Sequence, residues 1–188
     1  MAQGREATAT ATTGGRWATP ANGLSLLRLV LVPALAAAIV HERAWAGGLL
    51  FALAVATDLA DGPLARRRGE ASPLGGLLDH AVDATLCVVG LAAWAWRGEA
   101  PVVLAPLVAA AFAQYVLDSR ALAGRALRAS ALGRWNGIAY YVLVAVPLYR
   151  DALGLAWPAR GAIVAAGWLL VLSTLVSMAD RLLARRRA

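Results

Sequence analysis

Four aspartates stand close together in a segment that is otherwise flanked by apolar sequence. Asp58, Asp61, Asp79 and Asp83 are four of the eleven acidic residues of the chain. With no histidine ligand or thiolate in the set, they offer only carboxylate oxygens, which are the ligands that Mg²⁺ and Mn²⁺ prefer. Two such ions, about 3.5–4 Å apart, can hold a phosphate and stabilise both the attacking and the leaving oxygen. We therefore expect a site for two ions, Mg²⁺ or Mn²⁺, that acts on a phosphate.

The spacing of the aspartates predicts two helices that face each other. Asp58 and Asp61 are three residues apart and Asp79 and Asp83 four apart, so each pair shares one face of a helix. The intervening sequence RRRGEASP has the glycine and proline of a turn. In an antiparallel hairpin, Asp61 then lies at the depth of Asp79, and Asp58 at the depth of Asp83. Small residues on the same two faces leave room for a substrate: Gly62, Ala65 and Gly75.

Carboxylates at membrane depth need a compensating positive charge. Each one costs about 2.5–3.5 kcal/mol at the centre of a membrane helix, so the group must be paired, hydrated or bound to cations. Arg66 lies one turn beyond Gly62 and can bind a phosphate with both ends of its guanidinium. Arg28 lies about one turn inside the first predicted helix, where it could extend to the membrane surface or point toward the site. The sequence leaves both orientations of Arg28 open.

The elements that carry these residues are those of a helical membrane protein. Of the 188 residues, 60% are hydrophobic, whereas a soluble domain has about 45–50%. Apolar runs long enough to cross a bilayer occur near residues 24–41, 45–65, 73–96, 101–118, 132–149 and 161–179. We expect an all-α integral membrane domain of six transmembrane helices over residues 16–188. The polar residues 1–15 are predicted to be a disordered tail.

The arginines predict the orientation in the membrane. All eighteen basic residues are arginine, and the net charge is +7. Four of them fall on one side of the predicted helices, and most others fall on the side of the aspartates. The four are Arg43, Arg97, Arg150 and Arg160. The positive-inside rule then places both termini and the aspartates on the cytoplasmic side of the cell (inner) membrane.

The composition disfavours nucleic-acid binding and excludes sites that need more than one cysteine. Nucleic-acid binding is not expected, because the basic charge has no soluble domain to carry it and is better explained by topology and contact with membrane lipids. Cys87 is the only cysteine, which excludes an internal disulfide and a cysteine-based metal site.

The aspartate segment also resembles a known family. The pattern Asp58-x2-Asp61-Gly62-x2-Ala65-Arg66-x8-Gly75-x3-Asp79-x3-Asp83 is similar to the signature of the CDP-alcohol phosphatidyltransferases at every fixed position and gap. The segment PANGLSLLRLVLVP resembles the family's opening Pro-Asn-x-Leu-Thr-x2-Arg, with Ser25 in place of threonine and Ala21 inserted after Pro20.

This resemblance implies an integral membrane enzyme of phospholipid biosynthesis. Such an enzyme transfers a phosphatidyl or other phospho-alcohol group from a CDP-linked donor, such as CDP-diacylglycerol, to an acceptor hydroxyl and releases CMP. By position, Asp58 and Asp79 would bridge the two metal ions, while Asp61 and Asp83 would complete their shells. Asp83 would also be the general base. The residues implied to bind the CDP moiety are Asn22, Ser25, Gly62, Ala65, Arg66, Ser72 and Gly75. Family members are commonly homodimers, so a homodimer is expected.

Several residues near the motif have more than one interpretation. Ser72 could bind CDP or simply cap the third helix, because Pro73 follows it. Arg128 and Arg134, in the basic segment 117–137, could be topology signals or could bind a phosphate of the acceptor. His80 lies off the face of Asp79 and Asp83 and is expected to be a polar neighbour rather than a ligand.

The acceptor is left open by the sequence. The family's glycerol-3-phosphate enzymes usually carry proline and lysine where this chain has His80 and Ala84, which disfavours that acceptor. A cardiolipin-type acceptor, an inositol phosphate or another headgroup also fits the motif. Two further alternatives are an ion or proton transporter that uses intramembrane carboxylates and a non-catalytic relative that binds lipid or nucleotide.

Overall fold

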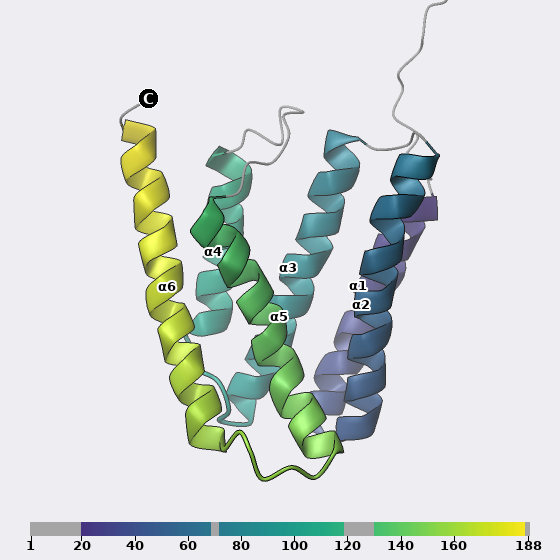
Figure 1. Ribbon diagram of the computed structural model, residues 1–188, viewed down its shortest axis with the longest axis vertical. Coiled ribbons are helices and arrows are strands. Elements are labelled where there is room, and N and C mark those ends of the chain that lie inside the picture. The colour runs from purple at the N-terminus through teal and green to yellow at the C-terminus, as the bar shows by residue number, and fades with distance from the viewer. Residues whose placement is uncertain (1–19, 69–71, 119–129, 187–188) are drawn as a thin grey trace, which may run out of the picture.

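Six α-helices form the part of the chain that the computed structural model describes, which is residues 20–68, 72–118 and 130–186. They are α1 (Pro20–Val40), α2 (Ala44–Arg67), α3 (Pro73–Trp96), α4 (Leu104–Asp118), α5 (Ala131–Ala152) and α6 (Arg160–Arg186). Consecutive helices run in opposite directions, and the start of α1 and the end of α6 lie at the same end of the bundle (Figure 1). The described residues contain no strand, so the all-α prediction is confirmed.

The helix boundaries match the predicted apolar runs to within a few residues at most ends. The largest difference is at the end of α6, which continues to Arg186 instead of ending near residue 179. The additional residues, DRLLARR, are mostly good helix formers, so the helix continues past the end of the apolar run. The predicted tail, residues 1–15, lies outside the described residues and stays a prediction.

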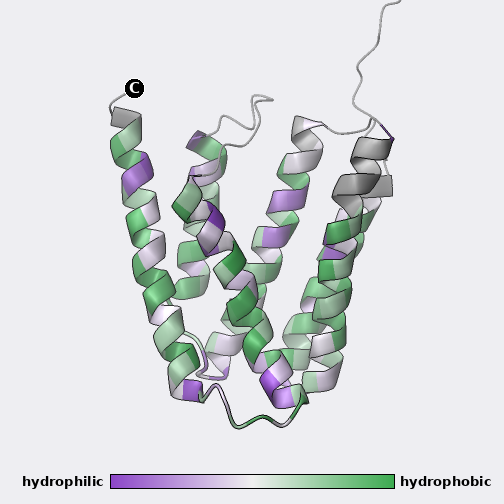
Figure 2. Ribbon diagram, viewed as in Figure 1, coloured by the Kyte–Doolittle hydropathy of each residue, from purple (hydrophilic) through white to green (hydrophobic). Residues whose placement is uncertain are grey.

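Within the described residues, three helices are long and apolar enough to cross a membrane, judged by length and composition. These segments are Gly23–Val40, Gly75–Trp96 and Arg160–Ala184, and shorter apolar helices cover Ala44–Ala60 and Leu104–Asp118. Large apolar side chains also cover the outside of the bundle, among them Val30, Leu49 and Leu169. Figure 2 shows the hydrophobic residues along the helices. Such an extended apolar exterior suits a lipid environment and would be a liability in water.

Helix α5 packs between helices from the two ends of the chain, because it contacts both α2 and α6. α1 packs on α2 and α3, α4 packs on α3 and α6, and α5 contacts α2, α3 and α6. At Gly90 of α3, an added Cβ would lie 3.0 Å from a methyl group of Val144 in α5, so the small residue permits a close approach. The buried Trp94 indole also donates a 3.1 Å hydrogen bond to the Val144 carbonyl. These contacts fix α3 against α5.

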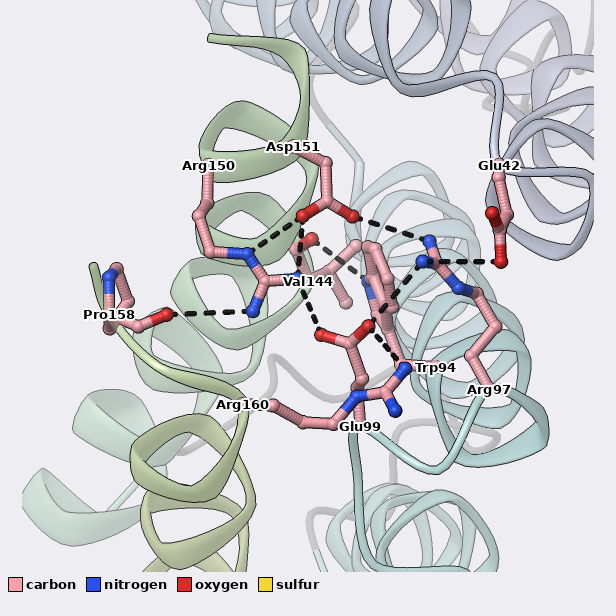
Figure 3. A network of polar contacts seen from close by, with 9 residues as sticks. All are labelled: Glu42, Trp94, Arg97, Glu99, Val144, Arg150, Asp151, Pro158 and Arg160. Carbon is pink, nitrogen blue, oxygen red and sulfur yellow. Dashed lines mark hydrogen bonds and ion pairs between the residues drawn. The ribbon is translucent and has the colours of Figure 1, made fainter. Parts of the chain in front are cut away.

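A polar network lies where α3 and α5 end and α6 begins, at the end of the bundle away from the aspartates. Figure 3 shows its residues. Its centre is Glu99, which follows α3 and is only 1% exposed. Glu99 Oε2 accepts a 2.7 Å hydrogen bond from Arg150 Nη2, and Oε1 accepts one of 3.1 Å from Arg160 Nη2. Arg97 Nη2 lies 3.5 Å from the same Oε1. The network therefore ties the α3–α4 connection to the adjoining ends of α5 and α6.

Candidate active site

The site begins with a buried stripe on α1. Ser25, Arg28, Val32, Leu35 and Ile39 are all buried and recur every three or four residues, which is the spacing of one helix face. Arg28 is fully buried, with 0% exposure, in a row whose other long side chains are apolar. Of the two orientations that the sequence left open, the structure has the one that points toward the aspartates.

Three of the aspartates converge on the guanidinium of Arg28. Its Nη1 lies 2.9 Å from Asp58 Oδ1 and 3.2 Å from Asp79 Oδ1, and it also contacts Asp83 Oδ1. One carboxylate oxygen from each of these aspartates lies within 4.8 Å of the others. The carboxylates are half-buried. α2 and α3 thus present their acids to each other, as the hairpin geometry predicted for Asp58 and Asp83.

A tyrosine from α5 completes this cluster. The Tyr141 hydroxyl donates a 2.8 Å hydrogen bond to Asp83 Oδ1. Its ring lies against Phe51 of α2, with ring centroids 6.0 Å apart. Sequence reasoning missed Tyr141, although a tyrosine in the middle of an apolar helix signals a hydroxyl that needs a partner.

The donor set fits a hard divalent cation. Asp58, Asp79 and Asp83 supply carboxylate oxygens alone, which suits Mg²⁺ or Mn²⁺ better than a softer metal. His80 is exposed, and its Nδ1 lies 2.9 Å from the Gly76 carbonyl oxygen. It does not belong to the acidic group found among the described residues, so its interpretation as a polar neighbour is supported.

A cavity of about 900 Å³ opens beside the carboxylates. Asp58 and Asp83 line it, and so do Arg134 of α5 and Arg181 of α6. The Arg181 guanidinium lies over the ring of Tyr115, 4.9 Å from its centroid. It also packs against Gly133, the residue before Arg134, where an added Cβ would lie 2.5 Å from Arg181 Nη2. The cavity is large enough for a small-molecule ligand, and it offers carboxylates and guanidinium groups on its walls.

The structure describes some of the other predicted site residues but not all of them. Ser72 caps α3, because its Oγ accepts a 3.0 Å hydrogen bond from the Gly75 amide, which confirms the capping interpretation. Ser25 is buried one turn before Arg28. Six predicted positions lie outside the residues, or side chains, that the structure describes: Asn22, Asp61, Gly62, Ala65, Arg66 and Arg128. Arg181, which lines the cavity, was not singled out from the sequence.

The comparison with known families decides the class of this site. The family model of CDP-alcohol phosphatidyltransferase matches residues 18–179, which is most of the chain. The chain belongs to this family. It is therefore a membrane enzyme of the phosphotransferase class that acts in phospholipid synthesis, as the aspartate motif implied. Membership in this family favours an enzyme over the transporter alternative.

One curated relative is similar to most of the chain, and others are similar to less than half of it. A CDP-diacylglycerol–glycerol-3-phosphate 3-phosphatidyltransferase of Cereibacter sphaeroides is 29% identical over 169 residues, covering 80% of this chain and 76% of the relative. A Mycobacterium tuberculosis protein named as a cardiolipin synthase is 41% identical over 73 residues, or 38% of this chain and 34% of its own. Another protein of that organism, named as a phosphatidylglycerophosphate synthase, is 38% identical over 95 residues, which cover 46% of this chain and 44% of the relative.

Proposed function

We propose that this phosphatidyltransferase uses CDP-diacylglycerol as donor and two Mg²⁺ or Mn²⁺ ions held by Asp58, Asp61, Asp79 and Asp83. The observation that supports this proposal most directly is the convergence of carboxylates from two helices, with three oxygens within 4.8 Å of one another. When bound, the ions would neutralise charge on the diphosphate and on the departing CMP. The reaction also needs a base and a place for the acceptor, which the chain's own side chains supply.

Asp83 is the general base in this proposal. It accepts the proton of the acceptor hydroxyl as that oxygen forms a bond to the phosphatidyl phosphorus. The bond from this phosphorus to the CMP oxygen breaks, and CMP leaves with the bonding electrons. The Tyr141 hydroxyl, 2.8 Å from Asp83 Oδ1, holds the carboxylate in one orientation. Asp83 lines the cavity, so an acceptor bound there reaches this carboxylate directly.

The CDP moiety is assigned to the ends of α1, α2 and α3 that adjoin the carboxylates. The residues proposed to bind it are Asn22, Ser25, Gly62, Ala65, Arg66, Ser72 and Gly75. The positions of Ser25, one turn from Arg28, and of Ser72 and Gly75, at the start of α3, support this assignment.

The proposed setting is the inner membrane, with all six helices spanning it and the active site facing the cytoplasm. The arginine distribution supports this orientation, because the side that carries the aspartates also carries most of the positive charge. The common end of the first and last helices in Figure 1 is consistent with two termini on one side. A homodimer remains the family expectation.

Release of CMP tests the reaction directly. Purified protein in micelles with CDP-diacylglycerol and a panel of acceptors should release CMP and form a new phospholipid, measured by mass spectrometry. Chelation of divalent cations should abolish the release, and added Mg²⁺ or Mn²⁺ should restore it, because the diphosphate must be neutralised before a nucleophile can approach. CMP release that survives chelation would contradict the metal assignment. Absence of CMP release with every acceptor and metal would favour a non-catalytic relative.

We further propose that the acceptor carries a phosphate. Arg134 and Arg181 line the same cavity as Asp83, and guanidinium groups bind phosphate well. Two relatives are named for transfer to glycerol 3-phosphate or for phosphatidylglycerophosphate synthesis, which adds support. Because His80 and Ala84 depart from the usual glycerol-3-phosphate pattern, the panel should include inositol phosphate and phosphatidylglycerol as well.

Loss of one cavity arginine should weaken acceptor binding more than turnover. Arg181→Gln is expected to raise the acceptor KM about 10-fold to 100-fold, the range for a lost charged hydrogen bond. The kcat at saturating acceptor should change little, because Arg181 does not contact the reacting carboxylates. Arg134→Gln should behave alike. Arg160→Gln removes the same charge at the far end of the bundle and serves as control. An unchanged acceptor KM in both cavity variants would remove the phosphate assignment.

A further inference from the structure

Arg28 has an unusual place for a charged side chain in an apolar bundle. It is fully buried on the same face of α1 as Val32, Leu35 and Ile39 and so does not extend to the membrane surface. Burying a charge at such depth is costly unless opposite charge lies close by. The opposite charge comes from Asp58, Asp79 and Asp83, which belong to two other helices. Arg28 therefore links α1 electrostatically to the carboxylates that α2 and α3 bring together.

We propose that Arg28 competes with divalent cations for these carboxylates, and that it thereby couples cation binding to binding of the anionic donor. The competition follows from which atoms are shared. The same oxygen, Oδ1, of each of the three aspartates contacts a single nitrogen, Nη1 of Arg28. That nitrogen carries only two N–H groups, so it cannot donate a well-aligned hydrogen bond to all three acceptors at once.

The position of this nitrogen is one that a cation would take. Asp58, Asp79 and Asp83 would hold such an ion through these oxygens, which lie within 4.8 Å of one another, so it would need the space between them. Nη1 already stands there, 2.9 Å from Asp58 Oδ1 and 3.2 Å from Asp79 Oδ1. A guanidinium and a divalent ion cannot share the position, because they overlap and repel. Entry of the ion therefore requires the guanidinium to move, and the lost ion pairs lower the affinity for the ion.

The displaced guanidinium needs another anion. The long arginine side chain can rotate about several bonds, and its planar fork binds phosphate oxygens with two hydrogen bonds. This step rests on the proposed function, which brings a diphosphate to the same carboxylates. Donor binding would then hold Arg28 away from the aspartates and strengthen cation binding, and the reverse must hold by linkage. In this scheme Arg28 binds the aspartates when the cation site is empty and the donor phosphate when it is filled.

Titration with Mn²⁺ alone tests the competition without any turnover. The purified protein in detergent micelles is stripped of metal and titrated, and free Mn²⁺ is followed by electron paramagnetic resonance. Arg28→Gln, which keeps most of the side-chain length but removes the charge, should bind Mn²⁺ on the order of 10-fold more tightly than the parent. Arg160→Gln loses the same charge at the other end of the bundle, so its affinity should equal that of the parent. A folded Arg28→Gln variant that binds Mn²⁺ equally or more weakly would overturn the proposal.

Removal of this counter-charge should also destabilise the metal-stripped protein. A chelator should therefore lower the Tm of Arg28→Gln more than that of the parent, and added Mn²⁺ should restore it. If Arg28→Gln is unfolded with and without Mn²⁺, Arg28→Lys replaces it in the titration. Lysine keeps the positive charge, but its compact ammonium lies on a shorter side chain and holds three carboxylates less well than a guanidinium does. The Arg28→Lys protein should therefore bind Mn²⁺ several-fold more tightly than the parent. An unchanged affinity in that variant would also count against the competition.

The coupling to the donor has its own measurement. CDP-diacylglycerol in the micelles should tighten Mn²⁺ binding in the parent and have a smaller effect in Arg28→Gln. An equal effect in both would contradict the coupling. Failure of the proposed reaction is recognised separately, because CMP release would then be absent while the difference in Mn²⁺ affinity persists.

Discussion

Asn in place of Asp83 is expected to lower kcat for CMP release about 1000-fold, within the range that a lost general base costs. The amide cannot accept the proton of the acceptor hydroxyl, although its shape preserves the packing around it. Arg28 still contacts Asp58 and Asp79 in this variant, so the bundle should stay folded. The measurement is steady-state CMP release by Asp83→Asn and by the parent at saturating donor and acceptor.

Loss of a base must be separated from loss of a metal ligand. The assay is therefore run over a range of Mn²⁺ concentrations, and kcat is compared where both proteins are saturated. Tyr141→Phe is the matched comparison, because it removes only the hydroxyl that donates to Asp83 and keeps the ring beside Phe51. The kcat of Tyr141→Phe is expected to be about 10-fold lower than that of the parent, which corresponds to the net free energy of one hydrogen bond. If Asp83→Asn keeps more than a tenth of the parent activity at saturating Mn²⁺, Asp83 is not the base.

The convergence of the carboxylates could be predicted because helix geometry alone decides it. A spacing of three or four residues places side chains on one face whatever surrounds them. The short connection between α2 and α3 then fixes which residues lie at equal depth. Asp58 and Asp83 meet as that reasoning required, and Asp79 joins them. The six helices could also be predicted, since long apolar runs separated by polar turns mark them, although α6 continues past its apolar run to Arg186.

The partners from other helices could not be predicted in the same way. In a water-soluble bundle the buried side of a helix is the apolar side, but in this chain the lipid-facing and core-facing sides are both apolar. On α1, the exposed Val30 and the buried Val32 have the same chemistry. The rotation of each helix about its axis is therefore hidden in the sequence. The inward direction of Arg28 and the positions of Tyr141 and Arg181 depend on that rotation.

The network around Glu99 was hidden for a second reason. Arg97, Arg150 and Arg160 were explained adequately by membrane topology, so nothing in the sequence required them to share one partner. Figure 3 shows that they surround a single carboxylate, which belongs to the connection between α3 and α4. Residues separated by more than fifty positions meet there, and only tertiary packing brings them together.

Replacing Glu99 with Gln should therefore cost about 3 kcal/mol of folding free energy, at the lower end of the range for breaking a buried ion pair. The carboxylate is 1% exposed and is the acceptor for Arg150 at 2.7 Å and Arg160 at 3.1 Å. The amide removes the negative charge and leaves Arg150 with Asp151 as its remaining ion-pair partner. The lower end is expected because Arg160 is 59% exposed and water can solvate it again. Thermal unfolding in detergent should show a Tm lower by about 6–12 °C.

Glu42→Gln provides the matched control, because Glu42 is 74% exposed and lies 3.7 Å from Arg97 in the same network. An exposed pair of this kind contributes about 0–1 kcal/mol, so its Tm should stay near that of the parent. CMP release per folded molecule should be retained in both variants, since the network lies at the end of the bundle away from the aspartates. If Glu99→Gln and Glu42→Gln have the same Tm, the buried ion pairs of Glu99 do not stabilise the bundle more than the exposed pair of Glu42 does. A Tm that falls only in Glu99→Gln would instead assign to this carboxylate the task of holding α5 and α6 against α3.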